Sequence, residues 1–383
     1  MFKEIIKLFP SSFFLLPTSR PFGLDISDYS IEMVYFEGSK EKPKLFALGR
    51  EILTPGIIKD GRILDKENLI KILNNLIFNS QFGQIKTRKL LFSLPESKSF
   101  IHDFELPKGL KQNEIPDFIK SQIVQTFPFP LNELYFDSKI KGNRVLLVAG
   151  QREIINQYLE AFKICKLQPV ALENESFSWS RALIKPRSEI SLLWGKEKEG
   201  IVLIIDIGTE TTNLVLFDGG EPILSFSIEI AGSHFTKVIS KKLNIPPQKA
   251  EEIKKRVGLN PKLKEGKIFF ILQKEILEIV EEIRKIDNYF QQKSGKKIEK
   301  IILIGGSSLL PFLPEYLSEN LEKEVSIGNP FSKIDTSILK EKESLKDTFE
   351  IDSVFYSTAM GLALRGLEKN PRGTGINLIK DVK

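Results

Sequence analysis

The sequence predicts an α/β protein in which one sheet-and-helix unit occurs twice and an α+β module is inserted into the first copy. Phe22–Phe36, FGLDISDYSIEMVYF, and Ile201–Phe217, IVLIIDIGTETTNLVLF, share one layout: an apolar strand with an aspartate near its end, a small or polar turn, and a second apolar strand. Ile301–Leu310, IILIGGSSLL, reads as a buried strand that ends in paired glycines before a helix. The repeated hairpin indicates a duplicated domain.

The composition is that of an ordinary globular chain that is long enough for two domains. Its 383 residues are 41% hydrophobic and 28% charged, and the net charge is +6. The positive charges form no single block, so nucleic acid is not an expected partner. Cys165 is the only cysteine, and His102 and His234 are the only histidines. The chain therefore forms no internal disulfide, and a histidine-based metal site or catalytic triad is not expected.

Residues 1–20 read as an arm ahead of the first unit. Their longest uncharged run, Leu8–Ser19, contains Pro10 and Pro17 and is too short to span a bilayer. Residues 2–9 also present one apolar helical face beside lysines. Two alternatives remain open, a packed or disordered arm and a weak anchor on a membrane surface.

The first unit continues with a strand at Leu45–Leu53 and with a helix that Asp65 caps. From residue 88 to 168 the pattern changes to strands and two amphipathic helices, which predicts a compact α+β insert. In the insert, Phe127–Pro130 reads either as a rigid connector whose rings pack locally or as an exposed ledge for a partner peptide. Residues 169–200 return to the first unit.

The second unit spans residues 201–351 and repeats the order of strands and helices. A third strand follows the central hairpin, and helices are expected from Gly232, from Pro247 and over residues 265–293. After the glycine pair, a helix is expected from Pro311. Residues 352–367 predict a helix with small residues that closes the first unit, and residues 368–383 a flexible tail.

This order of elements resembles the actin-like ATPases, the superfamily of actin, Hsp70 and the sugar kinases. Within it the sequence is most similar to the PilM family of type IV pilus assembly proteins, which is related to the cell-division protein FtsA. The likeness covers about residues 21–366. It rests on GLDIS at 23–27, TFPFPLNELYFD at 126–137, DIGTETTNL at 206–214, AEEIK at 250–254, SGKKIEKIILIGGSSLLPFLPEYL at 294–317 and IGNPF at 327–331.

The resemblance implies a two-lobed actin-like fold, of the duplicated ribonuclease H-like type, with an inserted 1C-type subdomain that faces partners. The first lobe, 1A, would comprise residues 21–87, 169–200 and 352–367. The insert would comprise residues 88–168, and the second lobe, 2A and 2B, residues 201–351.

The resemblance also implies a site for ATP and Mg²⁺. Asp25 and Asp206 would hold the metal, mostly through water, and Glu175 would orient the attacking water. Glu251 and Lys254 would reach the nucleoside. The residues expected around the nucleotide are Ser27, Gly208, Thr209, Glu210, Thr211, Thr212, Glu251, Lys254, Gly305, Gly306 and Ser307.

The residues alone leave other interpretations open. An Asp-Gly-Thr run is also ordinary hairpin chemistry, and a carboxylate such as Glu175 is favoured at any helix start. Glu251 and Lys254, three residues apart, also fit a solvated pair on a helix surface.

The first hairpin departs from the family pattern at Ser27, where the pattern has glycine, and at Glu32, where it has a lysine that faces phosphate. A carboxylate there repels phosphate unless it turns outward. ATP binding is therefore better supported than hydrolysis.

The function implied is that of a cytoplasmic ATP-binding scaffold, peripheral to the inner membrane, in a type IV pilus or related type II secretion platform. Its partners would be the N-terminal peptide of a PilN-like membrane protein, other platform proteins and assembly ATPases. An FtsA-like division scaffold and, less favoured, a small-molecule kinase are the alternatives. Because Ile376, Asn377 and Leu378 resemble the Ile-Asn-Leu peptide of PilN, the tail is expected to occupy the partner groove of its own or another copy.

Overall fold

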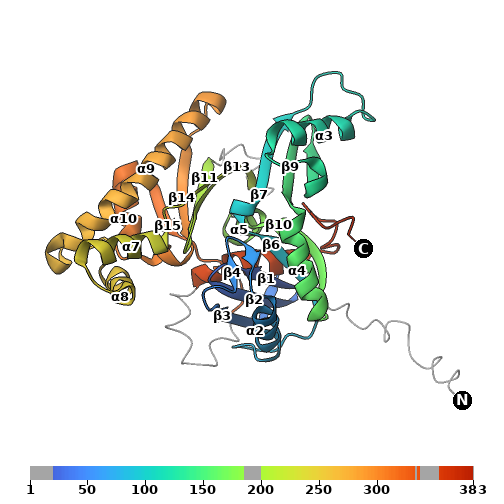
Figure 1. The fold of residues 1–383 in the computed structure, drawn as a ribbon. Coiled ribbons are helices and arrows are strands. Elements are labelled where there is room, and N and C mark those ends of the chain that lie inside the picture. Colours follow the sequence, from blue (N-terminus) through green and yellow to red (C-terminus); the bar gives the residue numbers. More distant parts are fainter. Residues whose placement is uncertain (1–19, 185–199, 333, 337–352, 383) are drawn as a thin grey trace, which may run out of the picture.

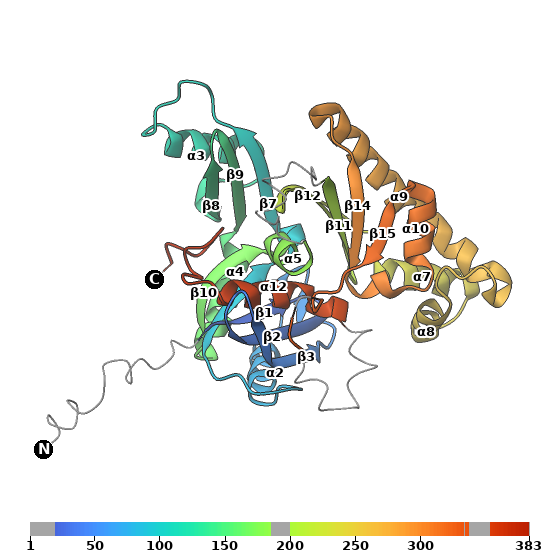
Figure 2. The same cartoon turned by 180° about the vertical axis from the view of Figure 1, so that it is seen from behind.

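A computed structural model of the chain describes residues 20–184, 200–332, 334–336 and 353–382. Two lobes lie side by side, and a smaller module stands on the first lobe (Figure 1, Figure 2). The arm expected at residues 1–20 lies outside the described residues except for Arg20, and so do residues 185–199 and 337–352. Among the described helices, none has both the length and the apolar character needed to cross a membrane.

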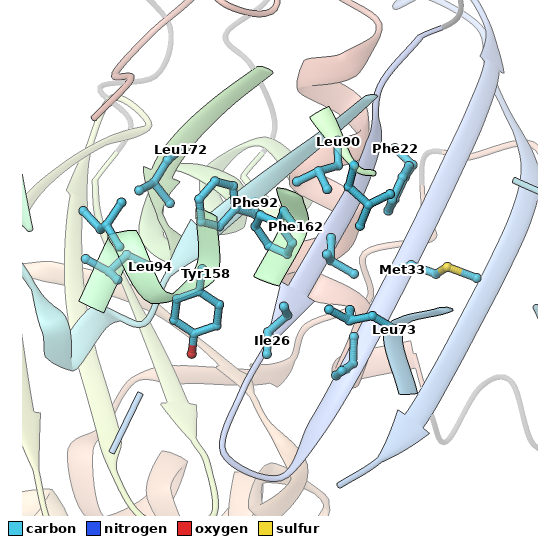
Figure 3. Packing of buried hydrophobic residues seen from close by; sticks show 14 of the residues in the cluster. Phe22, Ile26, Met33, Leu73, Leu90, Phe92, Leu94, Tyr158, Phe162 and Leu172 are labelled. Carbon is cyan, nitrogen blue, oxygen red and sulfur yellow. The ribbon is translucent and has the colours of Figure 1, made fainter. Parts of the chain in front are cut away.

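The first lobe is a five-stranded sheet with helices on both faces. It consists of β1 (Phe22–Ile26), β2 (Ser30–Gly38), β3 (Pro43–Ile52), β6 (Lys89–Leu94), β10 (Gln168–Asn174), α2 (Lys66–Phe78), α4 (Arg152–Ile164), α5 (Glu175–Leu183) and α12 (Ser357–Gly366). The strand order is β10-β6-β1-β2-β3, with β1 antiparallel to β2 and parallel to β6. α2 and α4 bury one face, whose packing Figure 3 shows, and α12 covers the other.

The second lobe repeats this architecture. It consists of β11 (Ile201–Ile207), β12 (Thr212–Asp218), β13 (Glu221–Ile228), β14 (Ile298–Ile304), β15 (Glu324–Ile327), α7 (Gly232–Leu243), α8 (Pro247–Val257), α9 (Lys267–Ser294) and α10 (Leu313–Leu321). Its order is β13-β12-β11-β14-β15, with β11 antiparallel to β12 and parallel to β14. Each lobe therefore has a hairpin followed on one side by parallel strands, which confirms the predicted duplication.

The inserted module has a small sheet and a core of its own. It consists of β7 (Ser99–Glu105), β8 (Leu134–Lys141), β9 (Arg144–Gln151) and α3 (Ile115–Thr126), in the strand order β7-β9-β8. The rings of Phe127 and Phe129 lie 5.4 and 5.6 Å from that of Phe100, between ring centroids. Phe127 is buried in the core of the module. This local packing favours the connector interpretation of Phe127–Pro130.

The predicted boundaries of the insert, 88 and 168, are wrong at both ends. β6 pairs with β1 and β10 in the sheet of the first lobe, and α4 packs in the core of that lobe through residues such as Tyr158 and Phe162 (Figure 3). The continuous apolar run of β6 is typical of a parallel strand that is buried on both faces. The inserted module begins only after this strand.

Candidate functional site

Three predicted acids face one another between the lobes. Asp25 lies near the end of β1, Asp206 near the end of β11 and Glu175 at the start of α5. Burial, then repulsion from Glu32 and Asp206, raises the pKa of Asp25 well above its ordinary value. Burial, then Asp25 and Asp206, raises the pKa of Glu175, and burial raises the pKa of Asp206 to about 6. The repulsion that Asp206 exerts on Asp25, and that both exert on Glu175, places the three carboxyl groups within electrostatic range of one another.

The position of Asp25 depends on a contact between the lobes. The Thr358 hydroxyl of α12 acts to lower the pKa of Asp25 and accepts a hydrogen bond from Trp179 Nε1 at 2.9 Å. The Trp179 ring is buried against strands of the second lobe. A movement of one lobe relative to the other would therefore change the surroundings of the Asp25 carboxylate.

The glycine pair lines the wall beside Asp206. Gly305 has a φ of +78°, which disfavours any other residue, and a Cβ there would collide with Asp206 Oδ1 and the carbonyl of Ile207. Ser307 Oγ donates to the carbonyl of Gly208 at 3.3 Å. The wall formed by residues 305–307 thus contacts the second hairpin directly.

Some hydrogen-bond donors at the turn of the second hairpin bind carbonyl groups of the same lobe. Gly208 N–H donates to Thr211 O at 3.0 Å, and the buried Thr212 hydroxyl donates to Ile230 O at 2.6 Å. The resemblance places these two groups at the phosphates, which stays a prediction, and in the structure both donate to carbonyl groups of the second lobe. Thr209 O accepts from a backbone N–H of α7, and Glu210 accepts from Ser233 Oγ at 3.1 Å. Thr211 is partly exposed at the turn.

The Ser27 side chain forms hydrogen bonds within the turn of the first hairpin. Its hydroxyl donates to Ser30 O at 3.0 Å and accepts from Ser30 N at the same distance. Tyr29 N also donates to it at 3.2 Å. The hydroxyl compensates for the missing glycine by fixing the turn, as serines in such turns do.

Glu32 does not turn outward. Its side chain is buried and accepts from Arg50 Nε at 2.8 Å. Burial raises the pKa of Glu32 while the Arg50 charge opposes this shift. The carboxylate therefore stays beside Asp25, with a guanidinium from the neighbouring strand as its counter-ion.

Glu251 and Lys254 are not a solvated pair. Lys254 is buried, and its Nζ donates to Gly232 O at 2.8 Å and to Thr236 Oγ1 at 2.9 Å. Glu251 lies 2.6 Å from the same nitrogen. Burial lowers the pKa of Lys254, and a Cβ on Gly232 would lie 2.5 Å from Ser307 Oγ. α8 and the glycine wall therefore meet at the start of α7.

These groups fit a nucleotide with its metal. The glycines permit close approach of a ligand to the backbone, and the paired aspartates would be relieved of their repulsion by a cation. In the described part of the chain, no group of three or more His, Cys, Asp or Glu side chains could hold a metal ion. Mg²⁺ would accordingly take most of its ligands from phosphate oxygens and water.

The sequence interpretation missed Glu96, which is buried between the lobes. Glu96 N–H donates to Glu175 Oε2 at 2.8 Å, and the Glu96 carboxylate accepts from Ser176 N at 3.1 Å. Burial raises the pKa of Glu96, and Ser225 of β13, in the second lobe, opposes this shift. Its position just after β6, at the carboxyl edge of a parallel strand, was the available signal.

The tail, expected to be flexible, is packed on the first lobe. Ile376, Asn377 and Leu378 are all buried. Leu378 N donates to Leu172 O of β10 at 2.8 Å, and Asn377 Oδ1 accepts from Leu172 N at 3.2 Å. The apolar side chains join the core of the first lobe, and this burial outweighs the entropy of a free tail.

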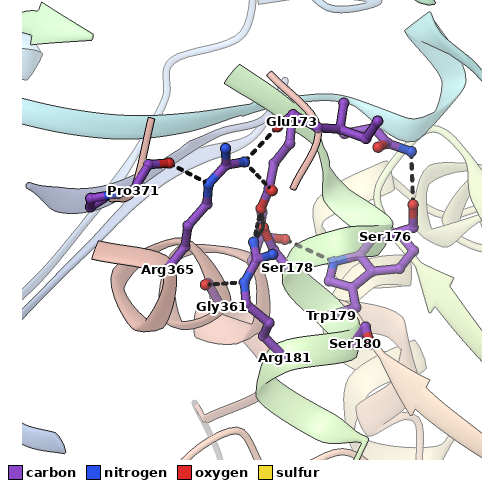
Figure 4. A network of polar contacts seen from close by, with 12 residues as sticks. Glu173, Ser176, Ser178, Trp179, Ser180, Arg181, Gly361, Arg365 and Pro371 are labelled. Carbon is purple, nitrogen blue, oxygen red and sulfur yellow. Dashed lines mark hydrogen bonds and ion pairs between the residues drawn. The ribbon is translucent and has the colours of Figure 1, made fainter. Parts of the chain in front are cut away.

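Charged groups also contact the tail where it packs on the first lobe (Figure 4). Arg365 donates to Ile376 O at 2.7 Å through Nη1 and to Pro371 O at 2.9 Å through Nε. Glu173 forms ion pairs with both Arg365 and Arg181. On the insert side, Asp137 accepts from Asn377 N at 2.8 Å and pairs with Lys380. The tail thus bridges the first lobe and the inserted module.

The comparisons with known proteins agree on one architecture. A family model described as type IV pilus assembly protein PilM matches residues 23–367. A solved structure described as the PilM-PilN type IV pilus biogenesis complex has a TM-score of 0.75 and 23% identity, and the match covers 92% of this chain and 100% of the other. The ethanolamine utilization protein EutJ from Carboxydothermus hydrogenoformans has a TM-score of 0.52 and 17% identity over 91% of this chain and 90% of its own. The expected two-lobed actin-like fold is confirmed.

The curated relatives include cell division protein FtsA. The protein of Pseudomonas aeruginosa is 28% identical over 213 residues, which are 50% of this chain and 48% of FtsA. That of Staphylococcus epidermidis is 22% identical over 249 residues, 57% of this chain and 51% of the relative. The chain spans about half the length of these curated relatives.

Proposed function

The chain belongs to the family of type IV pilus assembly protein PilM, and we propose that it is an ATP-binding scaffold on the cytoplasmic face of a pilus assembly platform. The proposed scaffold role applies equally to a platform of the related type II secretion system. The observation that carries it is the meeting of Asp25, Glu175 and Asp206 beside the Gly305 wall, between two lobes of duplicated fold.

Asp25 and Asp206 would hold Mg²⁺ through water, and the metal would neutralise the charge of the phosphates. The backbone from Thr209 to Thr211 would face the phosphates, and Glu251, Lys254 and the 305–307 wall would surround the nucleoside. Glu175, fixed by the N–H of Glu96, is the candidate for orienting a water molecule. We propose ATP binding as the function and weak hydrolysis as its accompaniment.

The partner we propose is the N-terminal cytoplasmic peptide of a PilN-like membrane protein, bound in the groove that the tail fills. The groove offers backbone groups of β10, the Arg365 guanidinium for peptide carbonyls and Asp137 for a peptide N–H. An extended peptide bound beside an outer strand gains such main-chain bonds. The tail is then a resident competitor that a partner must displace, in its own chain or in a second copy through Ile376, Asn377 and Leu378. Other platform proteins and assembly ATPases would bind elsewhere.

An FtsA-like division scaffold is the second candidate, favoured by the 28% identity to the Pseudomonas protein. Both candidates predict a nucleotide site, so only the partner separates them. A peptide that begins Ile-Asn-Leu, from a protein with one membrane helix, should bind the pilus scaffold.

The test combines both ligands in one titration. A fluorescent ATP analogue is titrated with and without Mg²⁺, and capture on the immobilised Ile-Asn-Leu peptide is measured at each ATP concentration. The proposal expects Mg²⁺-dependent binding of the analogue and saturable capture. Binding of neither ligand would refute it, and binding of the analogue without capture would favour the FtsA-like candidate.

A further inference from the structure

A row of three charged residues crosses the first hairpin and the neighbouring strand β3. In the antiparallel register Asp25 of β1 lies opposite Glu32 of β2, and Glu32 lies opposite Arg50 of β3. Residues directly opposite in antiparallel strands point to the same face of the sheet. This face is the one under α12, because Gly23, two residues before Asp25, packs against the backbone of Ala359 and Ala363.

Arg50 is held on two sides. Its Nε donates to Glu32 Oε1 at 2.8 Å, and its guanidinium lies 3.6 Å from the centroid of the Phe355 ring. Its side chain keeps 14% of its exposure, whereas that of Glu32 keeps 3%. Among the described residues, the hydrogen bond that the Arg50 side chain makes is the one from Nε, and its two terminal nitrogens donate none. The guanidinium is thus held in one orientation by its Nε, and its two terminal nitrogens can donate to a ligand.

The same residues place Arg50 at the gap between the lobes. Phe355, in the turn before α12, approaches the second lobe so closely that a Cβ on Gly306 would lie 2.9 Å from Phe355 Cε1. On the other side, Glu32 contributes to the repulsion that raises the pKa of Asp25. Arg50 therefore lies between two acids of the first hairpin, Asp25 and Glu32, and the wall formed by residues 305–307 of the second lobe.

We propose that Arg50 supplies the positive charge that binds the nucleotide phosphates beside the first hairpin, and that Glu32 positions the Arg50 side chain. This inference rests on the proposed nucleotide binding. A guanidinium has five N–H donors in a rigid plane, so Nε stays on Glu32 while the two terminal nitrogens bind two phosphate oxygens. The loop thus takes its positive charge from β3, although the hairpin itself carries a glutamate.

Calorimetric titration with ADP and with adenosine, both with Mg²⁺ present, tests the proposal in the full chain. The reference variant Glu32→Gln keeps an acceptor for Nε, and Glu32→Gln/Arg50→Gln removes the cation without leaving an unpaired charge. We expect the double variant to bind ADP at least 10-fold more weakly than the reference and to bind adenosine within twofold of it. Equal ADP affinity in the two variants, or equal losses for ADP and adenosine, would overturn the role of Arg50.

Two further variants keep the test decisive if the double variant does not fold. Arg50→Lys keeps the charge without the fork and should weaken ADP binding several-fold with adenosine unchanged. Glu32→Lys/Arg50→Gln moves the cation one strand along the row and should recover ADP affinity. An unchanged ADP affinity in Arg50→Lys, or no recovery in the second variant, counts against the inference. If the wild-type chain binds neither ADP nor adenosine, the proposed function itself fails.

Discussion

Asn377 accepts the backbone N–H of Leu172 through its side-chain Oδ1, at 3.2 Å, and so joins the C-terminal segment to β10 of the first lobe. The same strand ends two residues further at Asn174, and Glu175 follows it as the first residue of α5. One strand therefore leads from the packing site of the tail to the candidate nucleotide site.

The first prediction concerns the tail. Asn377→Ala leaves the buried Leu172 N–H without its acceptor and should weaken docking of the tail by about 1–3 kcal/mol. Because a resident tail lowers the apparent affinity of a competitor, the variant should bind the Ile-Asn-Leu peptide about tenfold more tightly. Fluorescence anisotropy of the labelled peptide measures this. Lys369→Ala, at an exposed position near the start of the tail, should leave the affinity unchanged. Tighter binding in neither variant would mean that the tail and the peptide do not compete.

The second prediction concerns the buried Glu173–Arg365 pair (Figure 4). Arg365→Met removes a buried guanidinium, leaves tail carbonyls without a donor, and should lower the free energy of unfolding by about 3–5 kcal/mol. Urea unfolding measures the loss. Arg284→Ala, which removes an exposed ion pair to Glu281, should cost less than about 1 kcal/mol. Similar small losses in both variants would show that the buried pair adds little.

The third prediction uses two glycines that both have a positive φ but differ in ψ, which is 162° at Gly305 and 3° at Gly295. Gly305 and Gly295 have φ values of +78° and +71°, but a Cβ meets Asp206 and the backbone of Ile207 at the first and nothing within 4 Å at the second. Gly295→Ala should cost about 1 kcal/mol, which is the strain alone. Gly305→Ala should cost at least about 1–3 kcal/mol more, because a side chain or the backbone must move and because the φ and ψ of Gly305 are accessible almost only to glycine. Equal losses in urea unfolding would show that the wall is not tightly packed against Asp206.

The fourth prediction concerns pH. Burial raises the pKa of Asp206 to about 6 in the folded chain, above its unfolded value. The folded state then binds more protons than the unfolded state between about pH 4 and 6, so this contribution to stability is full at low pH and is lost as pH rises through about 6. Without ligand, Asp206→Asn should therefore reduce the loss of stability between pH 5 and 7.5 by about 1 kcal/mol. Asp117→Asn, at an exposed position, serves as control. An unchanged pH dependence in Asp206→Asn would place the raised pKa elsewhere.

Local sequence patterns predicted most of the elements because their causes are local. The paired hairpins, the cap at Asp65, which accepts from Asn68 N at 3.1 Å, and the long helix α9 follow from alternation, capping and helical spacing. Where the pattern was ambiguous, the prediction failed. The apolar run of β6 suits an insert strand and a central parallel strand equally well, and only its pairing with β1 and β10 decides between them.

The features that the sequence did not predict all depend on contacts between distant segments. Arg50 becomes the partner of Glu32 only through the register of β2 and β3, and a one-residue shift would place it on the other face. Glu96 reaches Glu175 because β6 and β10 are neighbours in the sheet. The tail looked free because its few apolar residues have no partner in their own segment, whereas a groove between the first lobe and the insert buries them.

The most direct test of the central claim is calorimetric titration of the chain with ATP and Mg²⁺. The account predicts one binding site per chain, a large loss of affinity in Gly305→Ala, and wild-type affinity in Gly295→Ala, since only Gly305 lies against Asp206. Absence of ATP binding in the wild-type chain, or equal affinities in the two glycine variants, would contradict a nucleotide site between the lobes.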